Sequence, residues 1–440
     1  MTMIEKPTKV RHWVLFYICL MYMITYLSRV VISVAAPAII KEFTLTKVQM
    51  GVVFSAFVFP YALFQLPIGM LGDKYGPRKV LSTIVLLWSI FTGATALAWN
   101  LVSLVVFRVL FGMSEAGAFP NATRAFSHWL PTTERGFAGG ITHACARVAG
   151  GLTPVIVVAI MSLWGWRSAF VTFAIAGILW SAFWFVWYRD NPREFNERWG
   201  GVNRAEIDLI NGGGKPPKTV PTVPFSQLIG SKNLWLLGMS YFMYSFAFWI
   251  YLAWLPTYLV EARGFSLLSM SIFASLPMLA GAVGDALGGW ISDKLWARTN
   301  NAKFSRRSVP IFGLIMAALL MTPGAMTSSP YMAISLLTGG MFSMEISVGA
   351  YWAVCLDIGQ ESAGSAAGMM SCLGNAGSAV SPVVFGAVVQ YTGSWVYSFV
   401  IASILLFVGA ALWMGIHPEL SLDAERALRV NRLAALSVDS

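Results

Sequence analysis

Charged residues are scarce in this chain. Only 11% of its 440 residues are Asp, Glu, Lys or Arg, whereas 57% are hydrophobic. A soluble protein of this length would carry about a quarter charged residues. Repeated apolar stretches of roughly 18 residues or more are each long enough to cross a bilayer core about 30 Å thick as a helix. The composition therefore indicates an all-α integral membrane protein that crosses the bilayer many times.

Other features that are absent from the sequence narrow the range of possible functions. The four cysteines fall in or beside predicted helices without ligand spacing, so we expect neither a disulfide framework nor a zinc site. A short basic segment leads directly into a full-length apolar span, which is typical of a first helix rather than of a cleavable signal peptide. No soluble catalytic domain, phosphate-cradling loop or nucleophile–base pair is evident. We therefore expect no cofactor, no metal site and no enzymatic activity.

Twelve apolar stretches are long enough to be membrane spans. They centre near Cys19–Val34, Val53–Leu71, Ile84–Ala98, Val102–Phe119, Ile141–Met161, Phe170–Trp187, Leu234–Leu259, Ser271–Ile291, Ile311–Thr322, Met332–Ala350, Ala366–Val388 and Tyr397–Trp413.

Lysine and arginine gather in alternate loops between these spans. If the N-terminus is cytoplasmic, the inside loops hold 23 of the 30 Lys and Arg, as the positive-inside rule requires. Four lie in outside loops, namely Lys41, Lys47, Arg167 and Arg263, and three lie inside predicted spans, namely Arg29, Arg108 and Arg147. The net charge of +10 is therefore mostly loop charge beside lipid, and it does not indicate nucleic-acid binding. Both termini are predicted to be cytoplasmic.

A polar segment divides the chain into two halves of six spans. Residues 189–232 carry mixed charge and include the run NGGGKPPKTVPTVP, which is typical of a solvated cytoplasmic tether. The predicted domains are an N-terminal six-helix half (1–188), this linker (189–232), and a C-terminal six-helix half with a short cytoplasmic tail (233–440).

The two halves repeat each other. The motif Gly-x-x-x-Asp-Lys occurs at Gly69 and again at Gly289, 220 residues later. Arg147 in ARVAGGLTPVI aligns with Asn375 in GNAGSAVSPVV at an offset of 228, and Glu115 aligns with Glu345 at an offset of 230. Duplicated halves with polar residues at matching depths are the sequence pattern of a secondary transporter, whose site lies near the midplane between the repeats.

The motifs also resemble those of a known family. GDKYGPRK at residues 72–79 resembles the cytoplasmic loop motif of the major facilitator superfamily, and the sequence after Gly289 resembles its degenerate second copy. The runs beginning RVLFGMSEAGAF at Arg108 and YWAVCLDIGQES at Tyr351 are similar to the anion:cation symporter family within it. That family includes bacterial carriers of sugar acids and related organic acids. The resemblance implies the twelve-helix fold, with two pseudo-symmetric halves.

Arg29 is the strongest candidate for anion binding. A charge at the centre of a bilayer costs about 2.5–3.5 kcal/mol, and both interfaces are too far for Arg29 to reach. Its guanidinium is suited to bidentate binding of a carboxylate; the alternative is a structural pair with an intramembrane acid. The resemblance implies contact with the substrate carboxylate. The chain reads Ser28–Arg29 where sugar-acid carriers often read Asp-Arg, so one titratable group is missing there.

Glu115 is the candidate proton carrier. Arg108 lies seven residues earlier on the same face of the fourth span. A dry site favours a neutral carboxyl group, whereas a nearby arginine favours the charged form, so such a group can change protonation when its surroundings change. The resemblance implies the same role for Glu115. A static Arg–Glu pair is the alternative.

Further polar residues are candidates for orienting the substrate. Arg147 is either a second anion contact or the standing partner of Glu115, and His143 lies one turn earlier on the same face. The amide of Asn375 both donates and accepts hydrogen bonds, which suits a hydroxyl or carboxylate group; the alternative is helix–helix packing. Tyr61 resembles the family's substrate-facing tyrosine, and Gln65 lies one turn after it.

Two acids in the C-terminal half are secondary candidates. Asp285 occupies the repeat position of Gln65, and Glu345 that of Glu115; either acid is a candidate for coupling a second ion. Glu345 has no Lys or Arg in the predicted C-terminal spans, which favours a protonated carboxyl group.

The loop motif has a different role. Asp73 is expected to stabilise a neighbouring helix N-terminus through the helix dipole, whereas Arg78 and Lys79 are expected to remain near anionic lipid. The resemblance implies that these three residues form a cytoplasmic gate.

The sequence thus predicts a carrier for a small organic carboxylate or sugar-acid anion, coupled to inward proton movement by alternating access. Anion exchange without a proton stays open because of Ser28. Drug efflux is disfavoured by the three buried arginines, and a non-transporting sensor by the lack of a signalling domain. We expect a monomer in a bacterial inner membrane whose partners are the anion, protons and lipid.

Overall fold

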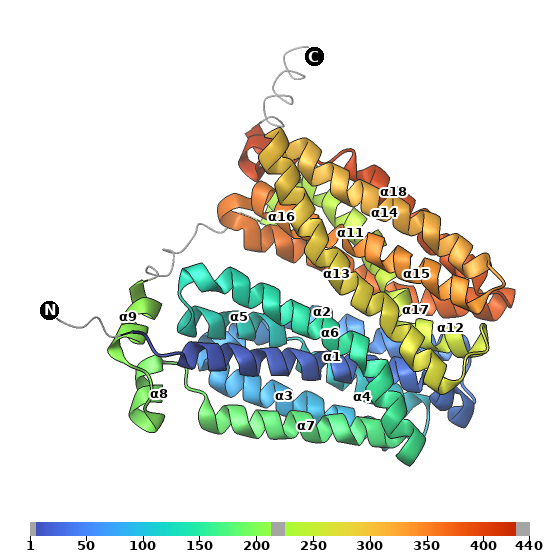
Figure 1. Cartoon of the computed structure of the whole chain (residues 1–440), viewed down its shortest axis with the longest axis horizontal. Helices are drawn as coiled ribbons and strands as arrows, with labels where there is room; N and C mark the ends of the chain where they lie inside the picture. The colour runs from blue at the N-terminus through green and yellow to red at the C-terminus, as the bar shows by residue number, and fades with distance from the viewer. Residues whose placement is uncertain (1–5, 213–224, 428–440) are drawn as a thin grey trace, which may run out of the picture. The chain divides into compact units, whose positions relative to one another are not determined.

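The computed structural model describes residues 6–212 and 225–427, and these residues are almost entirely helical (Figure 1). The helices up to residue 212 are α1 (Val10–Phe43), α2 (Lys47–Tyr75), α3 (Pro77–Thr95), α4 (Leu101–Glu115), α5 (Ala118–Trp129), α6 (Thr132–Trp164), α7 (Trp166–Trp187), α8 (Pro192–Trp199) and α9 (Arg204–Gly212). Those after residue 224 are α10 (Phe225–Gly230), α11 (Lys232–Ala253), α12 (Leu255–Glu261), α13 (Leu267–Thr299), α14 (Ala302–Met326), α15 (Pro330–Glu345), α16 (Val348–Gly359), α17 (Ala363–Thr392) and α18 (Val396–Trp413).

Every predicted span lies mostly within helix. Eleven helical segments in the described residues are long and apolar enough to cross a membrane. The remaining expected span, Ile84–Ala98, corresponds to the 19-residue helix α3. Its hydropathy is lowered by a first turn that contains Pro77, Arg78 and Lys79. The all-helical membrane architecture is therefore confirmed, and it makes the chain an integral membrane protein.

The chain divides into two compact units. The first unit comprises Met1–Lys218 with Phe265–Ser275, and the second comprises Thr219–Gly264 with Leu276–Ser440. The short piece Phe265–Ser275 includes the start of the predicted eighth span, Ser271–Ile291. The limits 1–188, 189–232 and 233–440 stay a prediction.

Polar residues at the span boundaries begin several helices. Thr46 and Gln49 form a capping box at the start of α2, and Asn100 and Ser103 form another at the start of α4. Such caps satisfy backbone N–H groups that have no partner within the helix. Short polar turns in an apolar sequence therefore fix where the spans begin.

Two arginines from the predicted outside loops cap helix ends. Arg167 donates from Nε to the Ala96 carbonyl at 3.0 Å, just beyond α3, and from Nη1 to Glu42 at 2.9 Å. Arg263 donates from Nη2 to the Ala325 carbonyl at 2.7 Å, in the last turn of α14. A cation at a helix C-terminus is favoured by the helix dipole, which explains why these loops contain arginine.

The first part of the linker is folded, and the prediction of a solvated tether is wrong for it. Phe195 of α8 packs between Trp129 and Trp187, with ring centroids 5.3 and 5.2 Å away. Glu206 of α9 is fully buried. In Figure 1, α8 and α9 lie at the end of the N-terminal unit where α1 begins. The tether predicted for residues 213–224 lies outside the described residues.

The loop between α2 and α3 holds the predicted gate residues. Asp73 forms an ion pair with Arg124 of α5, and Lys79 is exposed. The Arg78 backbone N–H donates to Asp190 at 2.9 Å, while the Arg78 side chain donates to the Phe185 carbonyl at 2.9 Å.

Asp190 at the start of α3 was not predicted from the sequence. Its carboxylate, rather than that of Asp73, lies at this helix N-terminus. Burial raises the pKa of the Asp190 carboxyl group, while the Arg78 backbone hydrogen bond opposes that shift. The only sequence signal for this role was an acid directly after the sixth span.

Gly76 in this loop should resist substitution. Its backbone has φ 82° and ψ 153°, and an added Cβ atom would overlap the Asp190 carboxylate. Conformations near this region are essentially restricted to glycine and cost other residues about 1–3 kcal/mol. We expect Gly76→Ala to lower the free energy of unfolding in detergent by about this amount. Gly136→Ala, at a helical position with no atom within 4 Å, is the matched control and should be neutral or stabilising. Equal effects of the two substitutions would contradict this explanation.

Candidate functional site

A buried ion pair joins α1 to α4 within the N-terminal unit. Arg29 donates from Nε to Oε1 of Glu115. The Glu115 side chain has no exposed surface, and the Arg29 side chain is 10% exposed. Removing one partner of such a pair leaves an uncompensated buried charge, which is strongly destabilising. Each residue therefore supplies the opposite charge that the other needs in this buried position.

Aromatic rings surround the Arg29 guanidinium. Its Cζ atom lies 4.6 Å from the ring centroid of Tyr61, 5.2 Å from Phe57, 5.4 Å from Tyr26 and 5.8 Å from Phe119. Ring faces attract a cation, and this attraction strengthens when water is excluded. Of these four rings, only Tyr61 was predicted as a site residue. Helical spacing offered a signal for two others, because Tyr26 precedes Arg29 by one turn and Phe57 precedes Tyr61 by one turn.

Several polar atoms of this site have no hydrogen-bond partner. They are Nη2 of Arg29, Oε2 of Glu115 and Nε of Arg108, and all three are buried. Arg108 is 3% exposed, and its guanidinium lies over the ring of Phe111 at 4.7 Å. Most buried polar groups in proteins are hydrogen-bonded, so unsatisfied groups call for an explanation. Two guanidinium donors and one carboxylate acceptor of this site thus have unused hydrogen-bonding capacity.

The repeated glutamates lie at corresponding positions in their spans. Helix α4 ends at Glu115, and α5 begins at Ala118. Helix α15 ends at Glu345, and α16 begins at Val348. The residues between these helices keep right-handed helical backbone angles, so each acid lies within one span, Leu101–Trp129 or Pro330–Gly359.

Other predicted residues lie around Arg29. Gln65 donates from Nε2 to the Tyr61 hydroxyl at 3.1 Å, so these two residues act as one polar unit. The His143 ring of α6 stacks on Phe119, one of the four aromatic rings around Arg29, with centroids 5.4 Å apart. Arg147 is half-buried one turn later on α6. Arg147 was one predicted partner of Glu115, and the structure shows an ion pair between Glu115 and Arg29.

The second glutamate has different surroundings. Glu345 is fully buried in the C-terminal unit, and its Oε1 accepts a hydrogen bond from the Tyr244 hydroxyl at 2.7 Å. A Cβ atom added to Gly281 of α13 would come within 3.0 Å of Glu345 Cγ, so glycine permits this close helix contact. The tyrosine partner was not predicted. The repeat therefore preserves the acid but changes its hydrogen-bonding group from guanidinium to phenol.

The remaining predicted residues lie on α13 and α17. Asp285 is half-buried four residues after Gly281. Asn375 is also half-buried and directly follows Gly374, which abuts the Tyr241 ring. Tyr241 and Tyr244 stack with centroids 5.4 Å apart, so the Gly374 backbone and the Glu345 carboxylate border one pair of tyrosines. Within the described residues, no group of three or more His, Cys, Asp or Glu could hold a metal ion.

Comparison with known proteins agrees with this architecture. The profile of the Major Facilitator Superfamily matches residues 18–374. Among solved structures, the chain is similar to a bacterial homologue of the human lysosomal transporter Spinster in an inward-facing, unoccupied conformation. The TM-score is 0.77 at 21% identity, over 94% of this chain and 97% of that one. At this identity the likeness concerns the fold alone.

Sequence relatives are named as transporters. The chain is 41% identical to the "Probable sulfoacetate transporter SauU" of Cupriavidus necator over 96% of its own length and 97% of the relative's. It is 30% identical to the hexuronate transporter of Bacillus subtilis, over 92% and 94% of the two chains. It is 29% identical to a "Probable galactarate/D-glucarate transporter" of Escherichia coli, over 94% and 92%. The chain belongs to the Major Facilitator Superfamily, and it is a membrane transporter rather than an enzyme.

Proposed function

We propose that this chain imports a small organic anion together with protons by alternating access. The observation that carries the proposal is the buried Arg29–Glu115 pair with an unsatisfied donor on Arg29 and an unsatisfied acceptor on Glu115. An arriving acid group binds Arg29 and weakens its bond to Glu115. A carboxylate that loses its counter-charge in a dry site favours its neutral form, so Glu115 takes up a proton. Release of the anion and proton restores the pair.

Membrane electrostatics supports this scheme. Moving one elementary charge through the membrane potential involves about 2.3 kcal/mol per 100 mV. A potential that is negative inside opposes the entry of an anion. One proton for each substrate charge cancels this opposition, and a further proton would drive uptake. Arg108 lies seven residues before Glu115 on α4, on the same face of the helix.

The names of the relatives support a small organic acid as the substrate. Sulfoacetate, hexuronate and galactarate or glucarate all carry a carboxylate on a short skeleton, and sulfoacetate adds a sulfonate. The carboxylate is a planar anion and the sulfonate a tripodal one, and a guanidinium binds anions of both shapes well. In this scheme Arg29 holds the acid group, while Tyr61, Arg147 and Asn375 orient the rest. Gln65, His143, Asp285 and Glu345 are secondary candidates.

Anion exchange without proton coupling is the second candidate. Ser28 stands beside Arg29 where sugar-acid carriers often have an aspartate, so one proton acceptor is absent. For the carrier itself we propose a monomer in a bacterial inner membrane, with both termini cytoplasmic. Asp73, Arg78 and Lys79 would then form a gate at the cytoplasmic side.

Binding should depend on an acid group and on Arg29. We expect sulfoacetate or a short carboxylate to raise the unfolding temperature of the purified protein, because a ligand of the folded state stabilises it by RT ln(1 + [L]/Kd). The corresponding neutral amide or alcohol should have no effect. Arg29→Lys keeps the charge but loses the planar fork, so we expect affinity to fall about 10- to 100-fold.

Arg204→Lys is the matched control for this measurement. Arg204 is an exposed arginine on α9, with a side chain that is 91% exposed, and its substitution should leave binding unchanged. Equal stabilisation by acids and amides, or an unchanged response in Arg29→Lys, would show that Arg29 is a structural ion-pair partner only.

Proton movement should depend on Glu115. In proteoliposomes, substrate addition should acidify the lumen of vesicles that contain the wild-type protein. Glu115→Gln retains a hydrogen-bonding group but cannot titrate, so we expect substrate-induced proton influx to be lost while substrate-for-substrate exchange continues. Glu197→Gln changes an exposed glutamate of α8 and is the control; it should retain proton influx. Proton influx that persists in Glu115→Gln would remove Glu115 from the coupling scheme and favour the exchanger.

A further inference from the structure

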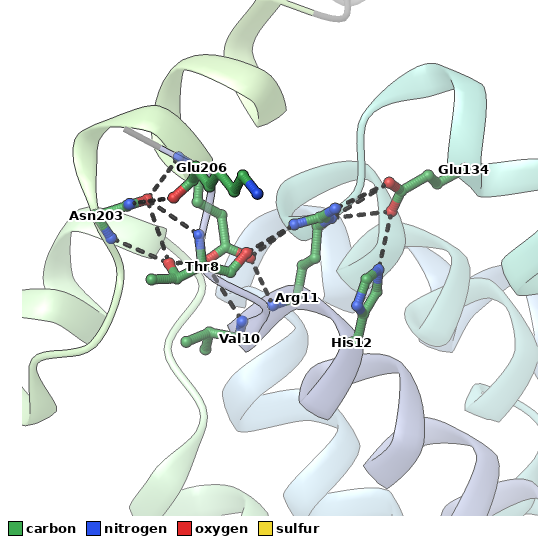
Figure 2. Close-up of polar contacts among 8 residues, drawn as sticks. Thr8, Val10, Arg11, His12, Glu134, Asn203 and Glu206 are labelled. Atoms are coloured by element: carbon green, nitrogen blue, oxygen red, sulfur yellow. Dashed lines mark hydrogen bonds and ion pairs between the residues drawn. The ribbon is translucent and has the colours of Figure 1, made fainter. Parts of the chain in front are cut away.

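A carboxylate from a distant helix holds the beginning of α1. Glu206 Oε1 accepts hydrogen bonds from the Arg11 backbone N–H and from Arg11 Nη1, each at 3.1 Å. Its Oε2 accepts from the Val10 backbone N–H at 3.4 Å and from the Thr8 hydroxyl (Figure 2). Helix α1 has no acidic residue in its own first turn. Glu206 therefore supplies both the acceptor for unpaired N–H groups and the negative charge that a helix N-terminus favours.

A second carboxylate holds the beginning of α11 in the same way. Glu425 lies in the helical residues 422–427, which follow α18. Its Oε1 accepts from the backbone N–H groups of Lys232 at 2.7 Å and Asn233 at 3.3 Å, and its Oε2 accepts from the Ser231 hydroxyl at 2.6 Å. Helix α11 also has no acidic residue in its first turn.

An asparagine amide reinforces each attachment. Asn203 at the start of α9 accepts from the Thr8 backbone N–H at 3.1 Å and donates to the Lys6 carbonyl at 2.7 Å. Asn233 at the start of α11 accepts from the His417 backbone N–H at 3.0 Å and donates to the His417 carbonyl at 3.3 Å. Each asparagine amide therefore joins a backbone N–H group and a backbone carbonyl group across the attachment. Asn203 belongs to the segment after the sixth span, whereas Asn233 belongs to the attached helix α11.

These attachments extend the internal repeat beyond the membrane spans. In each half, the segment after the sixth span reaches the start of the first span. Glu206 and Glu425 are 219 residues apart, and Thr8 and Ser231 are 223 apart, close to the offsets of the repeated motifs within the spans. We call the groups carboxylate clasps: the first is Glu206 with Thr8, Val10 and Arg11, and the second is Glu425 with Ser231, Lys232 and Asn233.

The first clasp also reaches α6. Arg11 is 8% exposed and donates from Nε to Glu134 Oε2 at 3.0 Å and from Nη2 to Oε1 at 3.2 Å. His12 Nε2 lies 3.6 Å from the same carboxylate (Figure 2). Arg11 thus connects Glu206 of α9 with Glu134 of α6. The helices joined here, α1 and α6, carry Arg29 and Arg147 of the candidate site.

We propose that the two carboxylate clasps make each half move as one body during transport, by fixing the free end of its first helix. The residues 192–212 and 421–427 are then working parts of the carrier. Arg29 lies 18 residues after Arg11, about 27 Å along the helix axis, so a clasp residue positions α1 without touching substrate. Loss of a clasp should lower the maximal transport rate and leave KM unchanged.

Limited proteolysis tests each clasp separately and does not depend on the proposed substrate. Trypsin cuts after Arg11 within the first clasp and after Lys232 within the second. We expect Glu206→Gln to accelerate cleavage after Arg11 about tenfold or more and to leave cleavage after Lys232 unchanged. Glu425→Gln should give the opposite pattern. Glu197→Gln, an exposed glutamate of α8, is the control and should change neither rate.

Two shortened chains provide an independent test of the second clasp. A chain ending at Ala427 retains Glu425, whereas a chain ending at Leu420 removes it. Only the shorter chain should expose Lys232 to trypsin and show a maximal transport rate reduced several-fold at unchanged KM. Cleavage patterns like that of Glu197→Gln, or both sites opening together in either glutamine variant, would overturn the proposal. A raised KM would also overturn it, because the clasp would then affect substrate binding directly.

Discussion

The ion pair between Arg29 and Glu115 is the constraint on which the rest of the site depends. Neither charge is tolerable alone at this depth in an apolar protein, because removing ions from water costs several kcal/mol each. The pair reduces this cost but leaves one guanidinium donor and one carboxylate acceptor unsatisfied. The aromatic rings around Arg29 exclude water and still attract its charge. A site of this kind is stable when empty and keeps unused hydrogen-bonding capacity.

Much of the fold was predictable from composition and periodicity. Apolar length placed most of every predicted span within helix. The repeat aligned Glu115 with Glu345, and these residues lie at corresponding positions, the last residues of α4 and α15. The folded part of the linker was also missed, because a mixed-charge sequence hides single buried contacts such as those of Phe195 and Glu206.

The candidate site was predictable in its charged residues but not in its partners. A charge in an apolar stretch is conspicuous in any membrane sequence, so Arg29, Arg108 and Glu115 were evident. Tyr26 and Phe57 were not, because 14% of the chain is aromatic and most such rings simply pack. Which acid pairs with which arginine depends on the rotation and depth of packed helices, and the sequence of one helix does not specify either.

The two halves combine a shared framework with different polar chemistry. Both have a fully buried glutamate at the last residue of a helix, and both attach their first helix through a distant carboxylate. Yet one glutamate bonds to a guanidinium and the other to a phenol. Retained backbone architecture with altered side chains is what a duplicated transporter needs if one half supplies most of the charge and the other adapts to the substrate skeleton.

Infrared difference spectroscopy on substrate addition tests the central claim most directly, because it observes carboxyl protonation itself. The account predicts that binding of the acid produces the C=O stretch of a protonated carboxyl group, and that this band is absent in Glu115→Gln but present in Glu345→Gln. No such band in the wild-type protein, or a band that persists in Glu115→Gln, would contradict the competition between substrate and Glu115 for Arg29.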